Sequence, residues 1–190
     1  GKQIETFVEQ PIAERELVMT ALVVLLFMEL FELLLVQTDP YFANDQYRQS
    51  RGEFVLLDFG ATRRFKSGFV NNYRKLTAAA MAGDHDKLIA AAERIGYAMG
   101  DANSEYRDLV LELFLLALEP LCEDTEYDFA HSDMAARMSQ LAERVTDYRD
   151  FWQAPPTDAV YFHRKLGGMF MLATRLRARV NVHQLIQRWL

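Results

Sequence analysis

The chain has few of the residues that build disulfide or zinc frameworks. Cys122 is the only cysteine among its 190 residues, which excludes an intramolecular disulfide and a cysteine-based zinc cluster. Three of the four histidines, His85, His131 and His183, are scattered without the spacing of metal ligands. Sparing use of cysteine is typical of a reducing compartment, so we expect a cytoplasmic location or one peripheral to a membrane.

Positive charge is also in short supply. The 21 lysines and arginines are outnumbered by 27 aspartates and glutamates, which gives a net charge of −6. This balance argues against nucleic acid as a partner and gives no support for a general attraction to anionic membranes. An acidic chain is compatible with divalent-cation sites, although an acidic surface needs no such function.

Several widespread functional motifs are absent. The sequence contains no G-x-S-x-G, H-E-x-x-H, G-x-G-x-x-G or Walker motif, which leaves triad hydrolases, zinc peptidases and dinucleotide-binding enzymes unsupported. It also has no internal repeat, low-complexity run, flexible linker or signal-peptide pattern. A chain of this length and composition is expected to form a single domain over residues 1–190.

One long hydrophobic run needs a separate explanation. Residues 17–36 are strongly apolar, but Glu29 and Glu32 lie within them. A charge at the centre of a membrane span costs about 2.5 kcal/mol or more on insertion scales. We therefore expect a buried core helix and no transmembrane span, with the two carboxylates facing a groove or partner charges.

Most of the remaining chain has the periodicity of helices. Asp84 and Gly100 are the expected start and end signals of one of them, and Gly52 supplies a positive φ for a turn between two short strands. The predicted helices cover residues 13–36, 67–82, 86–99, 104–119, 132–151, 157–179 and 182–190, and the predicted strands cover residues 45–49 and 53–57.

The most informative motif surrounds this predicted hairpin. Asp39 precedes Asn44 by five residues, and Asp58, Phe59 and Gly60 follow the second strand. Protein kinases have the same D-x-x-x-x-N spacing and the same D-F-G. In phosphoryl transfer an acidic group orients the nucleophile, while an amide oxygen and a carboxylate hold magnesium ions on the nucleotide phosphates. A hairpin would bring Asn44 and Asp58 beside each other.

Each part of this motif has a simpler explanation by itself. A D-F-G recurs by chance, and D-x-x-x-x-N is also the pattern of a turn residue followed by a helix cap. Their combination with the hairpin favours the kinase-like interpretation. Pro40 supports it, because a proline disfavours a helical conformation at Asp39 and so places the acid at a boundary between helix and loop.

Longer motifs make the comparison more specific. Q-T-D-P-x-x-x-N at residues 37–44, L-L-D-F-G-A-T-R at 56–63 and H-R-K-L-G-G at 163–168 occur in this order, with E-L-F-E at 29–32. In these motifs the chain resembles the UbiB/ADCK family of atypical protein-kinase-like proteins, which is linked to ubiquinone biosynthesis. The resemblance implies a mainly α (α+β) fold, a protein-kinase-like C-terminal lobe that is helical and carries the metal-binding motif on a short β-hairpin.

The resemblance also implies roles for individual residues. Asp39 would be the catalytic acid, while Asn44 and Asp58 would coordinate Mg²⁺ on ATP. Phe59 would pack behind the metal site, and Gly60 would give the backbone freedom there. Such a protein would bind a nucleotide and support ubiquinone or other isoprenoid-lipid metabolism, by ATP hydrolysis or small-molecule phosphorylation. Contact with a lipid, a membrane surface or a protein partner is left open.

Some family features differ or are absent. The family has Asn or His at the position of Tyr41 and a hydrophobic residue at that of Asp45. The chain contains no lysine-bearing N-terminal lobe, no glycine- or alanine-rich phosphate loop and no K-x-G-Q motif. It is therefore either a fragment, which Gly1 in place of a starting Met favours, or a degenerate relative. The alternative function is a non-catalytic, pseudokinase-like module that binds a protein or lipid partner.

Other residues of these motifs have structural interpretations. We expect His163 to bond to a backbone carbonyl or a carboxylate, and Gly167-Gly168 to mark the close packing of another element. Arg63 and Arg64 are expected to pair with a carboxylate, such as one of the two in residues 29–32. The alternative for these arginines is contact with an anionic substrate.

Overall fold

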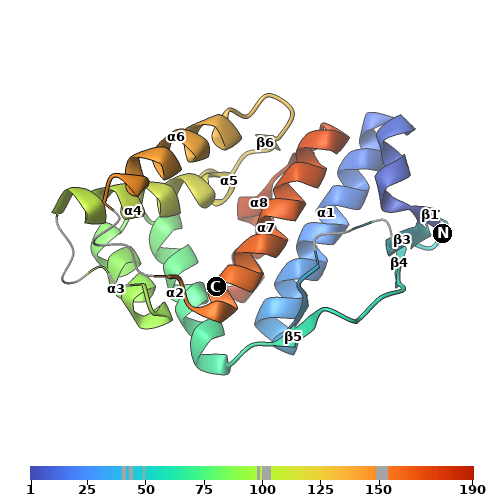
Figure 1. The fold of residues 1–190 in the computed structure, drawn as a ribbon. Helices are drawn as coiled ribbons and strands as arrows, with labels where there is room; N and C mark the ends of the chain where they lie inside the picture. The colour runs from blue at the N-terminus through green and yellow to red at the C-terminus, as the bar shows by residue number, and fades with distance from the viewer. Residues whose placement is uncertain (40–41, 43–44, 49, 98, 100–103, 149–153) are drawn as a thin grey trace.

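The computed structural model describes residues 1–39, 42, 45–48, 50–97, 99, 104–148 and 154–190. Helices predominate among these residues, and three small antiparallel sheets complete the fold (Figure 1). The mainly α class with a short hairpin is therefore confirmed.

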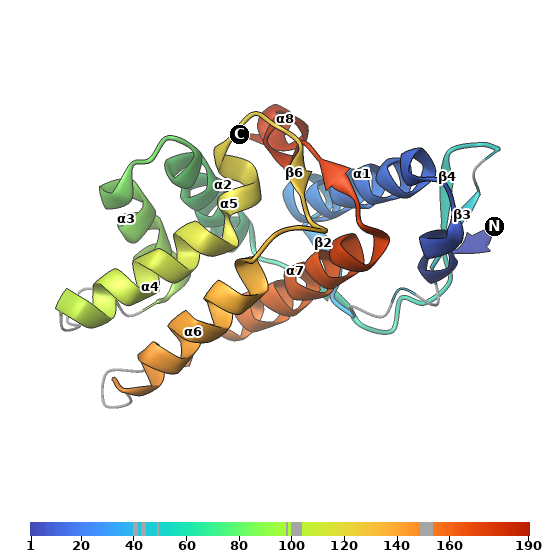
Figure 2. The same cartoon turned by 90° about the horizontal axis from the view of Figure 1, so that it is seen from above.

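Two long helices form the centre of the fold. α1 (Ile12–Met28) and α7 (Thr157–Leu176) contact each other and lie side by side in both views (Figures 1 and 2). Four further helices gather beside this pair: α2 (Ser67–Met81), α3 (His85–Ile95), α4 (Ser104–Ala117) and α6 (Met134–Thr146). The shorter helical elements are η1 (Ile4–Glu9), α5 (Glu119–Cys122), α8 (Val182–Ile186) and η4 (Gln187–Trp189).

The largest sheet lies across the central pair from α3 (Figure 1). Its three strands pair antiparallel in the order β1 (Lys2–Gln3), β3 (Asp45–Arg48) and β4 (Glu53–Leu56). Two smaller sheets join β2 (Leu35–Gln37) to β5 (Thr62–Arg64) and β6 (Tyr127–Asp128) to β7 (Arg179–Val180).

The hairpin between β3 and β4 has the predicted turn. Asp45 pairs with Leu56 and Arg48 with Glu53, and Gly52 in the connection has a φ of 64°. A residue without Cβ adopts this φ without strain. β4 ends one residue earlier than predicted, and residue 49, the predicted end of the other strand, lies outside the described residues.

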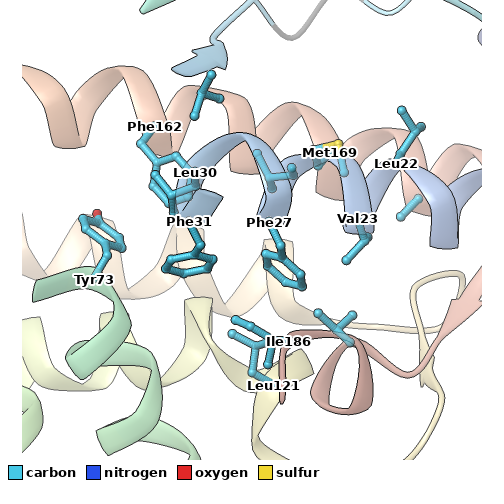
Figure 3. Packing of buried hydrophobic residues seen from close by; sticks show 14 of the residues in the cluster. Leu22, Val23, Phe27, Leu30, Phe31, Tyr73, Leu121, Phe162, Met169 and Ile186 are labelled. Carbon is cyan, nitrogen blue, oxygen red and sulfur yellow. The ribbon is translucent and has the colours of Figure 1, made fainter. Parts of the chain in front are cut away.

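A large apolar cluster holds the helices together. The rings of Phe27, from α1, and Phe31, from the helical turn that follows it, point toward Leu121 and Ile186, and Met169 of α7 packs on another side of α1 (Figure 3). None of these five side chains exposes more than 8% of its surface. Full burial of one such side chain contributes about 1.5–3 kcal/mol, so the cluster is the main source of stability between the elements.

The predicted helix over residues 13–36 is too long. α1 ends at Met28, a π-helical turn, η2 (Glu29–Leu33), follows, and Leu34 has a φ of 53° before β2 begins. Apolar periodicity does not distinguish a buried helix from a short buried strand, and residues 35–37 pair with β5 instead of continuing the helix. The chain therefore turns back just before Asp39.

Other helices also end earlier than predicted. Asp84 caps α3 as expected, because its side chain accepts a hydrogen bond from the amide of Lys87. That helix ends before Gly96, which has a φ of 118°, and Gly100, its predicted end, lies outside the described residues. α7 stops where Arg177 takes a left-handed φ of 53°.

The apolar run at residues 17–36 belongs to the interior. In the part of the chain that the structure describes, no helix is long and apolar enough to cross a membrane. The run is divided between α1, the π-helical turn and β2, and its buried hydrophobic residues belong to the apolar cluster.

Candidate functional site

Hydrogen bonds tie together the two motif segments that carry the acids. The side-chain amide of Gln37 donates to the backbone oxygen of Asp58 at 2.6 Å. The backbone amide and the hydroxyl of Thr38 both donate to the backbone oxygen of Ala61, at 3.2 and 2.8 Å. The amide of Asp39 donates to the side-chain oxygen of Gln37 at 3.3 Å. Asp39 and the D-F-G loop lie against each other because β2 and β5, which flank them, are paired.

Asp58 is held by its own loop. Its Oδ1 accepts a hydrogen bond from the amide of Gly60 at 2.7 Å, and the residue is otherwise exposed. A Cβ at position 60 would lie 3.1 Å from that oxygen, so glycine permits this close approach. The carboxylate is therefore fixed in direction and accessible to a ligand.

Asp39 lies between this loop and α7. Its side chain is 36% exposed, and Oδ1 is 3.4 Å from a guanidinium nitrogen of Arg164. Its backbone oxygen is 3.4 Å from Nζ of Lys165. The charges of Asp39 and Asp58 both act on Asp45 at the start of β3. The structure thus brings the two predicted acids to one end of the hairpin.

The predicted metal ligands are Asn44 and Asp58. Asn44 lies outside the described residues, but the next residue, Asp45, pairs with Leu56 near the end of β4. Within the described ranges, no three His, Cys, Asp or Glu side chains group closely enough to hold a metal ion. Mg²⁺ usually keeps several waters and takes one or two protein carboxylates plus substrate phosphates. The accessible carboxylate of Asp58 fits such an ion.

A cluster of buried charges lies behind the acids. Glu29, Asp45 and Lys165 are each no more than 8% exposed. Together with Gln37 they line a cavity of about 10 Å³, which is room for about one water molecule. Glu29 comes from the π-helical turn, Asp45 from β3 and Lys165 from α7, so the cluster joins three elements at the site.

Burial changes the proton affinities in this cluster. Loss of hydration raises the pKa of Glu29 to about 7, against the attraction of the Lys165 ammonium. Burial also raises the pKa of Asp45; the Lys165 ammonium counteracts this shift, whereas the charges of Asp58 and Asp39 add to it. Burial lowers the pKa of Lys165, and the neighbouring carboxylates counteract that shift. Near neutral pH, Glu29 is therefore divided between its protonated and charged forms.

Phe59 does not pack as predicted. Its ring is 62% exposed and the neighbouring Leu57 is 58% exposed, so the predicted packing behind the metal site is wrong for this chain. The reason is that residues 57–61 run along the surface between β4 and β5. A role for Phe59 in binding the nucleotide stays a prediction.

The H-R-K-L-G-G motif contributes a residue that the sequence interpretation missed. His163 bonds to the hydroxyls of Tyr73, at 2.5 Å, and Tyr97, at 3.3 Å, so the predicted carbonyl or carboxylate partner is wrong. Lys165, two residues later, contacts the backbone oxygen of Asp39. The sequence did contain a signal for this residue, because Lys165 lies on the apolar face of a predicted helix.

Two other expectations about the motifs are also tested. A Cβ at Gly167 would meet nothing within 4 Å, so the predicted close packing at this glycine is wrong. Arg63 forms the expected ion pair, but its partner is Asp158 of α7, at 2.8 Å, and its guanidinium lies over the ring of Tyr161. The first turn of α7 supplies this carboxylate, and Arg63 therefore ties β5 to α7.

The fold and the site define a kinase-like lobe, because a hairpin joins the D-x-x-x-x-N segment to a D-F-G loop in a helical domain. The fold is similar to that of Rv3197 from Mycobacterium tuberculosis, solved in complex with erythromycin, with a TM-score of 0.71 and 18% identity. That match covers 100% of this chain and 47% of Rv3197.

Sequence comparison identifies the family. Residues 1–92 match the ABC1 atypical kinase-like domain. The chain is 31% identical to atypical kinase coq-8, mitochondrial, of Caenorhabditis elegans, over 95% of this chain and 24% of that protein. It is 33% identical to atypical kinase COQ8B, mitochondrial, of Rattus norvegicus, over 84% of this chain and 30% of that protein. The chain is a relative of these atypical kinase-like proteins and spans only about a quarter to a third of their length.

Proposed function

We propose that residues 1–190 form, as a single domain, the C-terminal lobe of an atypical kinase or ATPase that binds Mg-ATP. The observation that carries the proposal is the direct joining of the two motif segments. Hydrogen bonds from Gln37 and Thr38 hold the D-F-G loop against Asp39. Two short motifs that occurred by chance would have no reason to meet in the fold. The kinase-like fold and the atypical-kinase relatives support the same interpretation.

Each residue of the proposed site has a separate task. The accessible carboxylate of Asp58 and the amide oxygen of Asn44 would hold Mg²⁺, and the amide of Gly60 limits rotation of Asp58. Bound Mg²⁺ would neutralise charge on the nucleotide phosphates. Asp39 would orient the attacking hydroxyl or water and accept its proton, with Arg164 at 3.4 Å limiting the motion of its carboxylate.

The nucleotide is the proposed ligand, and the phosphate acceptor would be water or a small molecule. In line with the family resemblance, we assign the protein a supporting role in ubiquinone or other isoprenoid-lipid metabolism. The two relatives described above are named as mitochondrial proteins. For this chain, a location peripheral to a membrane and contact with a lipid or protein partner stay predictions.

The proposal is tested by Mg²⁺-dependent ATP binding to the full-length gene product. Calorimetric titration with and without Mg²⁺ compares the parent with Asp58→Asn, which keeps the shape of the side chain and removes its charge. We expect the variant to lose about 10-fold or more in Mg²⁺-dependent affinity. Asp86→Asn, at an exposed position in the first turn of α3, is the matched control. Equal Mg-ATP affinity in the parent and Asp58→Asn would refute the assignment.

A non-catalytic binding module is the second candidate. Asp45 places an extra buried carboxylate beside the predicted ligand Asn44, and the exposed Leu57 and Phe59 leave apolar surface at the D-F-G loop. Such a module would bind nucleotide or a partner without turnover. Phosphate release from ATP by the parent and by Asp39→Asn separates the two functions. Turnover that the variant loses supports the enzyme, whereas ATP binding without turnover in either protein supports the module.

A further inference from the structure

Lys165 is unusual because it lies in the interior of the lobe. The residue is only 6% exposed, although lysine is almost never fully buried unless it is paired. It occupies the face of α7 that also buries Phe162 and Met169. A buried ammonium must replace its lost hydration with nearby polar groups, so its neighbours indicate what it does.

Four groups surround the Lys165 ammonium. Nζ lies 3.4 Å from the backbone oxygen of Asp39 and 4.5 Å from the centre of the Phe42 ring. The carboxylates of Glu29, from the π-helical turn, and Asp45, from β3, line the same cavity and act on Nζ electrostatically. The ammonium therefore connects α7 both to the end of the first long helix and to the motif segment that begins at Asp39.

Compensation of buried charge explains only part of these contacts. The charges of Glu29, Asp45 and Asp39 all act on Nζ, but neutralising them does not require contact with the Asp39 backbone oxygen or the Phe42 ring. The preceding residue, Arg164, lies 3.4 Å from the Asp39 carboxylate. Consecutive residues of α7 thus contact Asp39 through its backbone and through its side chain.

We propose that Lys165 is a positioning residue, whose buried ammonium holds the Asp39 backbone and the Phe42 ring and so fixes the direction of the Asp39 carboxylate. This inference rests on the proposed function, because the direction of Asp39 matters for catalysis only if Asp39 acts on the substrate. Lys165 acts through Asp39 and not on the reacting atoms.

Loss of the ammonium should affect turnover more than nucleotide binding. The proposed Mg-ATP ligand Asp58 is held separately, by Gln37 and by the amide of Gly60. A misplacement of about 1 Å in a catalytic group can reduce the rate by about 100-fold. We expect kcat to fall by about 10- to 100-fold, with KM for ATP changing by less than about 3-fold.

The test variants must remove the ammonium without changing the net charge of the buried cluster. Lys165→Met alone would leave Glu29 and Asp45 without their cation, which is strongly destabilising for a buried pair. The double variant Lys165→Met/Glu29→Gln removes one charge of each sign. The single variant Glu29→Gln shows how much of the effect comes from the substitution at position 29. Lys75→Met, at an exposed lysine of α2, is the surface control.

Two measurements on the full-length gene product test the proposal. Hydrogen exchange followed by mass spectrometry reports on a peptide covering residues 37–47, and steady-state assays give kcat and KM for ATP. We expect the double variant to exchange this peptide about 10-fold faster than the parent and to show the loss in kcat. Glu29→Gln and Lys75→Met should stay close to the parent in both measurements.

The outcomes distinguish positioning from a structural role. A structural lysine would lower the melting temperature of the double variant but leave exchange in residues 37–47 and kcat of the folded protein unchanged, and that result would overturn the proposal. Faster exchange with unchanged kcat would also overturn it. If the parent neither binds nor turns over Mg-ATP, the proposed function fails. In that case hydrogen exchange alone tests whether Lys165 holds the Asp39 segment. If the double variant exchanged residues 37–47 at the same rate as the parent, this structural part of the proposal would be overturned as well.

Discussion

The substitution Glu29→Gln tests the buried cluster directly, because it keeps the shape of the side chain and removes its titration. In the folded chain, burial raises the pKa of Glu29 from 4.5 to about 7. In the unfolded chain the carboxyl is hydrated and has its ordinary pKa. The folded state therefore holds this proton more tightly than the unfolded state does.

A raised pKa in the folded state makes stability fall as pH rises. The contribution of protonated Glu29 is fully present below pH 4.5 and is lost as pH rises through about 7. The shift corresponds to an upper limit of about 3 kcal/mol. The attraction of the Lys165 ammonium lowers this pKa and is already included in that limit. Between about pH 4 and pH 8, the stability of Glu29→Gln relative to the parent should therefore rise by about 1–3 kcal/mol.

Urea denaturation of the parent and the variant at both pH values measures this difference. Other titrating groups are shared by the two proteins, so the comparison isolates position 29. Glu32→Gln is the matched control, because its side chain is 50% exposed and the variant retains Glu29. It should keep the pH dependence of the parent.

The account of the cluster is refuted if the stability difference between Glu29→Gln and the parent is the same at both pH values. That result would mean that Glu29 remains charged in the folded chain with no net effect of burial. A variant that instead becomes less stable than the parent as pH rises would show that the attraction between Glu29 and Lys165 exceeds the desolvation of the carboxylate.

Three further predictions concern backbone and core, and urea denaturation checks each. Gly167→Ala should stabilise the chain by about 1 kcal/mol, because the new Cβ meets nothing within 4 Å and alanine favours the helix; a loss of stability would restore the predicted close packing. Gly96→Ala should destabilise by more than about 1 kcal/mol, since φ is 118° and the Cβ would lie 2.7 Å from Cγ of Pro156. Leu30→Ala should cost about 2–5 kcal/mol, because the side chain is 1% exposed. Parental stability in either of the last two variants would contradict the structure.

Features that depend on neighbouring residues could be predicted from the sequence. The hairpin follows from Gly52 between two strand-forming segments, and the positive φ of this glycine confirms the predicted turn. The start of α3 follows from Asp84, whose carboxylate binds an amide three residues later. In both cases the interacting groups lie within a few positions, so the local sequence contains the necessary information.

The end of the first long helix could not be predicted in the same way. Leu35 pairs with Arg64 of β5, and the end of the apolar run, Leu35 and Val36, forms a strand only because that partner is present. An apolar run is equally compatible with a buried helix or a buried strand when its partner is unknown. The π-helical turn before it likewise depends on how the chain packs.

The candidate site was also predictable only where its residues lie close together in the sequence. Motif spacing predicted that Asp39 and Asp58 belong together, and the bonds of Gln37 and Thr38 confirm that their segments meet. The contact between Asp39 and Lys165 spans 126 positions, so it depends on the placement of α7; the local sequence indicates only that this lysine lies on an apolar helix face, not what it contacts. Asn44 lies outside the described residues, and its role as a metal ligand stays a prediction.

The cavity behind the site explains how the two acids are fixed while their carboxylates stay accessible. Gln37 bonds to the amide of Asp39 and to the backbone oxygen of Asp58, and Lys165 contacts the backbone oxygen of Asp39. Both side chains line the same cavity as Glu29, so the backbones of the acids are held from the interior. Backbone attachment leaves the Asp58 carboxylate free to meet a ligand, and a site held by packed supporting side chains loses less entropy on binding. The buried Lys165 and Gln37 therefore make physical sense as supports of the site, because apolar side chains could not form these bonds to the backbone.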